Sequence, residues 1–189
     1  AKLQEALSGA GERVYDKGVI LQTLGFVAAQ QEKYGQATKY FADAIATGGL
    51  PQPVAQQVRY NLAQLYMAEG NFKGSINTMN QWFASLGKDE KPTPHAYITL
   101  ANAHVQLKQY REAIPAVDQA IKLSAGKAPE SWYLLKMAAH YELKQYKPAT
   151  EVLTALVDKF PEKKKYWTQL SAMHMQARND AKALAALEG

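Results

Sequence analysis

The chain has 189 residues, of which 47% are hydrophobic and 21% charged, and both values are ordinary for a globular protein. It contains no cysteine, which excludes disulfides, thiolate metal sites and a cysteine nucleophile. The net charge is +5, all of the excess lies in residues 71–189, and no apolar run is long enough to predict a membrane-spanning segment.

One stretch of the sequence occurs twice in nearly the same form. HVQLKQYREA occupies residues 104–113, and HYELKQYKPA occupies residues 140–149. Further copies align with these two and share a column of mostly small residues, spaced by 34 to 38 positions. The column reads Gly25, Ala63, Ala101, Met137 and Ser171. A period of this size predicts stacked helical hairpins.

The repeats follow one another from the first residue. Residues 1–17 fit as the second helix of a truncated repeat. Five further units are expected over residues 18–51, 56–89, 94–127, 130–163 and 164–189. Two connections, near residues 48–53 and 88–94, are longer than a minimal repeat needs. We nevertheless expect one domain over 1–189.

Each unit is predicted to contain two helices. In the unit that starts at residue 18, apolar positions recur with the spacing of one helical stripe, followed by a polar turn and a second stripe. The first stripe comprises Leu21, Leu24, Gly25 and Ala28, and the second comprises Ala37, Phe41 and Ala44. Glycine and proline clusters between the units mark the ends of the hairpins.

The order of small, aromatic and alanine positions resembles the tetratricopeptide repeat family across essentially the whole chain. The matching positions are Leu24, Gly25, Tyr34, Ala37, Phe41 and Ala44; Leu62, Ala63, Tyr66 and Phe72; Tyr110, Ala113 and Ala120; and Tyr146, Ala149 and Pro161. Met137 and Ser171 depart from the usual Gly or Ala of the crossing column, and Met79 and Trp82 depart in a second helix. The resemblance implies an all-α, right-handed superhelical solenoid of antiparallel helix pairs.

A narrower resemblance concerns the C-terminal stretch 160–188. Its residues Lys165-Tyr166-Trp167, Gln169-Leu170 and 183–187 are similar to periplasmic tetratricopeptide proteins that accompany TonB–ExbB–ExbD systems of Gram-negative bacteria. This resemblance implies a periplasmic adaptor of an envelope transport system, and a cytoplasmic location stays open.

Three histidines, His104, His140 and His174, occupy the same column of successive repeats. Equivalent positions in stacked hairpins lie roughly 10 Å apart, whereas zinc needs ligand nitrogens about 2.1 Å from one ion. Packing between helices is therefore the favoured interpretation. No nucleophile motif, phosphate-binding glycine loop or paired carboxylates occur, so we expect neither an enzyme nor a cofactor or metal site.

The densest charge run is Lys163-Lys164-Lys165, with Lys159 just upstream. Such runs are most often solvated loops, and this interpretation is favoured over a patch for nucleic acid or an acidic surface. Nucleic-acid binding by helical repeats would need basic residues along the groove, and these are absent. We therefore expect no nucleic-acid partner.

The candidate binding surface lies on the first helices, one position round from the core stripe. In the resembled family this stripe faces the inside of the superhelix, and solenoids bind partners on such surfaces. The predicted partner-binding residues are Phe26, Tyr60, Gln64, Met67, Ile98, Asn102, Val105, Leu134 and Tyr141. The full stripe, which also includes Ala138, Ala172 and Met175, holds no Lys, Arg, Asp or Glu. This disfavours a clamp for a C-terminal carboxylate and favours a segment with apolar anchors.

The sequence therefore predicts a scaffold that holds a peptide or protein segment in a concave groove, without inserting into a membrane. Two alternatives stay open. The first is a structural subunit that self-associates through exposed terminal repeats, at Leu3 and Leu7 or at Ala183 and Leu187. The second, less favoured, is a nucleic-acid-binding helical repeat. A third interpretation packs the stripe itself into a tight inner curve or against a neighbouring subunit.

Overall fold

The computed structural model describes residues 2–176, and these residues form ten α-helices with no β-strand. The chain divides into two compact units, residues 1–92 and 93–189. The first contains α1 (Lys2–Gly9), α2 (Val14–Gln30), α3 (Tyr34–Ala46), α4 (Gln52–Ala68) and α5 (Phe72–Ser85). The second contains α6 (Pro94–Gln106), α7 (Tyr110–Leu123), α8 (Glu130–Glu142), α9 (Tyr146–Lys159) and α10 (Lys164–Gln176). The border falls in the long 88–94 connection. The expectation of one domain stays a prediction.

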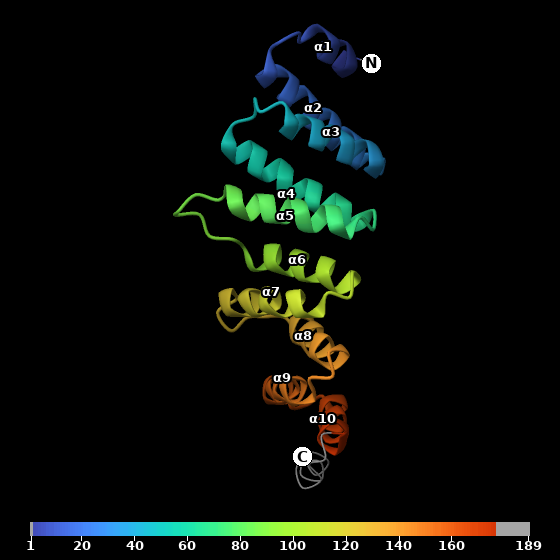
Figure 1. The fold of residues 1–189 in the computed structure, drawn as a ribbon, viewed down its shortest axis with the longest axis vertical. Coiled ribbons are helices and arrows are strands. Elements are labelled where there is room, and N and C mark those ends of the chain that lie inside the picture. Colours follow the sequence, from blue (N-terminus) through green and yellow to red (C-terminus); the bar gives the residue numbers. More distant parts are fainter. Residues whose placement is uncertain (1, 177–189) are drawn as a thin grey trace. The chain divides into compact units, whose positions relative to one another are not determined.

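Consecutive helices pair as hairpins within each unit, α2 with α3 and α4 with α5, then α6 with α7 and α8 with α9 (Figure 1). Two helices begin four residues before the expected starts of their repeats. The first is α2, which starts at Val14 and not at residue 18, and the second is α4, which starts at Gln52 and not at residue 56. Gly18 lies inside α2, where a Cβ atom would stand 3.0 Å from the Leu50 side chain. Pro53 stands in the first turn of α4, where a missing N–H is tolerated.

Small residues let the two helices of a hairpin cross closely. Gly25 of α2 is the clearest case, because a Cβ atom there would lie 2.5 Å from the buried ring of Phe41 on α3. Ala63 and Ala101 hold the same column in the later hairpins, and both are fully buried. The column identified in the sequence is thus small and buried in the first three hairpins, whereas Met137 holds it in the fourth.

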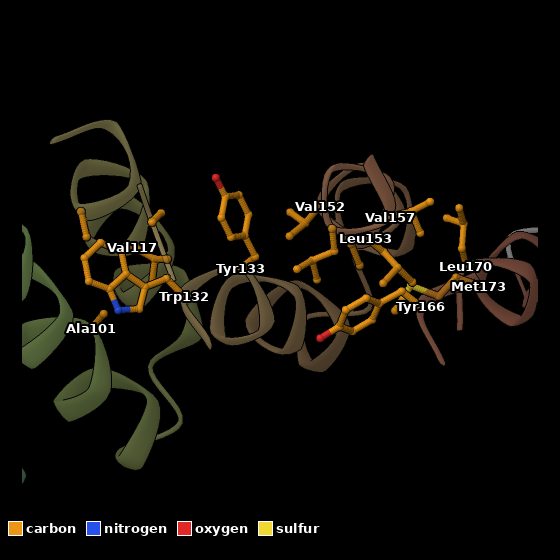
Figure 2. Close-up of a cluster of buried hydrophobic side chains, with 14 of the residues drawn as sticks. Ala101, Val117, Trp132, Tyr133, Val152, Leu153, Val157, Tyr166, Leu170 and Met173 are labelled. Carbon is orange, nitrogen blue, oxygen red and sulfur yellow. The ribbon is translucent and has the colours of Figure 1, made fainter. Parts of the chain in front are cut away.

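Each unit has its own buried core. In the first unit, Phe41, Val58 and Leu62 form a cluster that joins α3 to α4. In the second unit, a larger cluster runs from Ala101 and Trp132 to Leu153 and Tyr166 (Figure 2). Fully burying a large apolar side chain contributes roughly 1.5–3 kcal/mol, so this cluster is the main stabilising feature of the helices around α8.

The four hairpin turns share one backbone device. One residue in each turn has a left-handed conformation, and the next residue donates its N–H to a carbonyl five positions back. The left-handed residues are Glu32, Gly70, Lys108 and Lys144, with φ between 57° and 74°. The closing bonds are Lys33 to Ala28, Asn71 to Tyr66, Gln109 to His104 and Gln145 to His140, at 2.8–2.9 Å.

The aligned histidines support two of these turns. His104 Nδ1 lies 2.9 Å from Gln109 Oε1, and His140 Nδ1 lies 2.8 Å from Gln145 Oε1. Each glutamine immediately precedes the second helix of its hairpin. The histidine ring therefore links the end of one helix to the start of the next, which supports the packing interpretation. Among residues 2–176 no group of acidic or histidine side chains has the geometry of a metal site.

Within the described part of the chain, no helix combines the length and the apolar character that a bilayer crossing requires.

Glycine at the left-handed positions is expected to stabilise the fold. A left-handed conformation costs an ordinary L-residue about 1 kcal/mol, which glycine does not incur. Lys108→Gly and Lys144→Gly should therefore each raise the free energy of unfolding by about 1 kcal/mol. Chemical denaturation followed by circular dichroism measures this, with Gly70→Ala as the opposite control. Two destabilised glycine variants would contradict this explanation of the turns.

Candidate partner-binding surface

In the first unit, two predicted aromatic residues are held by the second helix of their own hairpin. The Phe26 side chain is 39% exposed, and its ring centroid lies 5.1 Å from that of Phe41 in an edge-to-face arrangement. Tyr60 is half-buried, with its ring centroid 5.3 Å from that of Trp82. Gln64 is exposed and Met67 is half-buried. Each ring thus serves the hairpin on one side and stays partly accessible on the other.

In the second unit, the predicted residues divide between core and surface. Ile98 and Leu134 pack against the buried cluster, and Asn102 and Val105 are half-buried. Tyr141 is 43% exposed, and its ring centroid lies 5.8 Å from that of Tyr146 across the α8–α9 turn. Ile98 and Leu134 are therefore mainly core residues, whereas Tyr141 presents an aromatic ring to the surroundings.

A cleft of about 330 Å³ lies between the first helices α8 and α10. Its lining comprises Met137, Ala138, Tyr141, Glu142, Gln169, Ala172 and Met173. Ala138, Tyr141 and Ala172 belong to the stripe that the sequence singled out. Met137, Glu142, Gln169 and Met173 were not in that stripe. The cleft is mostly apolar, with one amide and one carboxylate.

Two alanines of one repeat column line the cleft. The column reads Phe26, Gln64, Asn102, Ala138 and Ala172 along the chain. The first three repeats therefore carry larger side chains at the positions of Ala138 and Ala172. Both alanines are exposed. A comparison of side-chain volumes down this column is the sequence signal that could have located the cleft.

Glu142 gives the cleft a charge that the sequence stripe did not include. It is the last residue of α8, directly after Tyr141, and it is exposed. Equivalent positions in the earlier repeats carry Gln30, Ala68 and Gln106. The predicted stripe itself carries no charged residue, but the cleft also includes Glu142, which lies one residue outside the stripe.

Two other clefts occupy equivalent places in the two units. One, of about 420 Å³, lies among α7, α8 and α9, and the other, of about 460 Å³, lies among α1, α2 and α3. His140 and Pro148 line the cleft among α7, α8 and α9, and their repeat equivalents Ala28 and Gln36 line the cleft among α1, α2 and α3. In the cleft among α7, α8 and α9, Lys136 Nζ pairs with Asp118 Oδ1 at 2.6 Å. This recurrence indicates that such clefts come from the stacking of repeats.

The lysine run after α9 is engaged in contacts within its own unit. Lys163 and Lys165 both donate to the carboxylate of Glu130, which begins α8. The Lys163 ammonium lies 4.9 Å from the Phe160 ring centroid, and that of Lys159 lies 5.5 Å from the Tyr133 ring centroid. The run is therefore not a solvated loop, because Lys164 and Lys165 begin α10 and the Lys163 and Lys165 side chains tie the start of α10 to the start of α8. Hydrogen bonds from Lys163 and then Lys165 lower the pKa of the Glu130 carboxyl.

Comparison with known proteins identifies the repeats. One tetratricopeptide repeat model matches residues 94–126, and another matches residues 23–83. No curated protein sequence matches the chain. The predicted class, an all-α solenoid of antiparallel helix pairs, is confirmed by the helices and by the structural matches. The right-handed superhelical course stays a prediction.

Solved structures with the same fold have low sequence identity to the chain. A crystal structure of MamA protein is 14% identical, and the match covers 90% of this chain and 88% of that one with a TM-score of 0.70. YrrB, described as a TPR protein with an unusual peptide-binding site, is 13% identical over 100% of this chain and 90% of that one, with a TM-score of 0.70. MamA of Desulfovibrio magneticus RS-1 is 16% identical over 92% of both chains, with a TM-score of 0.66. These identities show a common fold.

Removing the Glu130 charge is expected to lower stability in a pH-dependent way. A carboxyl whose pKa is lowered by folding stabilises the protein above its unfolded-state pKa of about 4.3, and the effect is lost as pH falls through the folded-state pKa. The stability difference between wild type and Glu130→Gln should therefore be largest near pH 7 and shrink on acidification. Denaturation midpoints between pH 7 and pH 3 measure it.

A matched control is Glu162→Gln, because Glu162 is an exposed neighbouring carboxyl. Its stability difference from wild type should stay small across the same range. A Glu130→Gln difference that does not change with pH would contradict the assigned ion pairs.

Proposed function

We propose that this tetratricopeptide repeat protein is a non-enzymatic scaffold that binds a peptide or protein segment on its first helices. The observation that carries the proposal is the cleft between α8 and α10, which is lined by apolar side chains and a partly exposed tyrosine. Largely preformed, mostly apolar clefts with a few polar groups are typical binding sites. YrrB, which shares the fold, is described as having a peptide-binding site, and this supports a peptide ligand here.

The proposed mechanism is binding to a surface that is already ordered. Tyr141 is braced by Tyr146, and Met137 packs against the buried cluster, so little of the site must be ordered on binding. The partner then bears most of the entropic cost of association. Phe26, Tyr60 and Met67 would supply further apolar anchors in the first unit. Gln64 and Asn102 would hydrogen-bond the backbone of the partner.

A second candidate function is self-association, and one observation favours it. Val14 and Tyr15 are adjacent at the start of α2 and are 51% and 56% exposed, and neighbouring exposed apolar side chains favour an interaction surface. Leu3 and Leu7 of the neighbouring α1 are half-buried. The other predicted end, Ala183 and Leu187, lies outside the described residues. A second copy of the chain could cover the exposed side chains near α1.

We further propose a periplasmic location and a role beside a TonB-type system. The support is the resemblance of residues 160–188, of which 177–188 lie outside the described part of the chain. Release of the native protein by osmotic shock, and its crosslinking to envelope transport components, are the expected results. Recovery only with the cytoplasmic fraction would contradict this location without affecting the scaffold proposal.

Filling the cleft is expected to abolish partner binding while preserving the fold. Ala138→Trp adds a bulky side chain at an exposed position, so the core stays intact. Truncating Phe26 or Tyr60 would be less informative, because both rings also pack within their hairpins. We expect Ala138→Trp to weaken binding of a partner captured from a native extract at least tenfold, about 1.4 kcal/mol, as measured with the purified pair.

The matched control is Gln119→Trp, which places the same side chain at an exposed position of the second helix α7. It should bind like the wild type, and all three proteins should have the same helical circular dichroism. Equal binding by Ala138→Trp would move the site away from the cleft. Failure to capture any partner, with light scattering that shows concentration-dependent oligomers, would favour self-association.

A further inference from the structure

We propose that the cleft between α8 and α10 accepts a basic side chain, lysine or arginine, from the bound segment. The aliphatic stem would lie along Met137 and Met173, and the cationic head would meet the Glu142 carboxylate beside the Tyr141 ring. This inference rests on the proposed function and assigns the chemistry of the partner at one position.

The charge of the cleft carries the argument. Glu142 is the one charged residue among the seven that line it, so no cation in the lining offsets its negative charge. Within residues 2–176 the Glu142 carboxylate makes no hydrogen bond or ion pair. The lining therefore carries a net negative charge and offers a carboxylate that is still unpaired.

The position of Glu142 in its helix adds to the negative charge of the cleft. It is the last residue of α8, where the aligned peptide dipoles give the helix end a partial negative charge. A carboxylate is unfavourable at a helix C-terminus, and a cation is favourable there. A lysine or arginine head group at this place would pair with the carboxylate and with the helix end together.

The remaining lining suits the rest of such a side chain. Lysine and arginine carry apolar stems that pack along apolar surface while the charged head stays polar. Met137 and Met173 provide adaptable apolar walls, and Ala138 and Ala172 leave the necessary space. An accessible tyrosine ring attracts a cation through its negative face. Tyr141 supplies that ring next to Glu142.

The same repeat positions elsewhere do not offer this combination. In the three earlier repeats, the position of Glu142 is held by Gln30, Ala68 and Gln106, and the position of Ala138 is held by bulkier residues. The preference for a basic residue is therefore expected at one cleft and not along every repeat. A segment with an acidic residue at this position would be repelled by Glu142.

Selection from a random peptide library tests the proposal without knowledge of the natural partner. A display library of twelve-residue random peptides is selected on the whole chain, in wild-type, Glu142→Gln, Glu142→Lys and Glu151→Gln forms. Glu151 is an exposed carboxylate of α9 that lines a different cleft, so its substitution is the matched control. The selected sequences and the affinities of synthetic peptides are the readouts.

We expect wild type and Glu151→Gln to enrich lysine or arginine at one position, roughly threefold or more over the library. Glu142→Gln should lose the enrichment and bind a wild-type-selected peptide about tenfold more weakly, which corresponds to about 1.4 kcal/mol. Glu142→Lys should enrich aspartate or glutamate at that position. Because Glu142 is exposed, Glu142→Gln and Glu142→Lys are both expected to fold. If Glu142→Lys does not fold, the loss of basic enrichment in Glu142→Gln is sufficient to test the proposal.

Two results would overturn the inference in different ways. Peptides that bind wild type and are blocked by Ala138→Trp, yet show no basic enrichment, would refute the basic partner and leave the scaffold proposal intact. Absence of any peptide binding, or binding that Ala138→Trp does not affect, would refute both proposals for this cleft.

Discussion

The close crossing of two helices within each hairpin is the constraint on which the rest of the structure depends. At Gly25, even one added methyl group would meet the Phe41 ring at 2.5 Å. That position can therefore hold only glycine, whereas the equivalent buried positions of the next two hairpins hold Ala63 and Ala101. Packing within the hairpin consequently determines which face of the first helix remains accessible to a partner.

The fourth hairpin departs from this constraint, and the departure coincides with the candidate site. Met137 replaces the small residue of the crossing column, and its side chain both packs on the buried cluster and lines the cleft. At the next position, Ala138 removes the bulk that Phe26, Gln64 and Asn102 provide in the earlier repeats. The lining of the cleft thus combines a larger residue of the crossing column with a smaller one beside it.

The fold could be predicted from the sequence because the repeat period and the small-residue column can be recognised from residue types along the chain. Other features depend on relations that single positions do not show. A repeat unit was expected to start at residue 18, yet Gly18 is a close-packed residue inside α2, beside Leu50. Lysine at 108 and 144 gives no sign of a left-handed turn. The cleft depends on side-chain volumes on two helices, and Glu142 lies one residue beyond the predicted stripe.

The two acidic ends of α8 show why unpaired charge is more informative here than charge alone. Glu130 begins the helix, where a negative charge is favourable, and Lys163 and Lys165 already satisfy its carboxylate. Glu142 ends the same helix, where a negative charge is unfavourable, and it has no such partner within residues 2–176. A cation that approached Glu130 would compete with two lysines, whereas one that approached Glu142 would displace none. The structure therefore explains Glu130 by the fold alone, while the fold leaves Glu142 for a partner to neutralise.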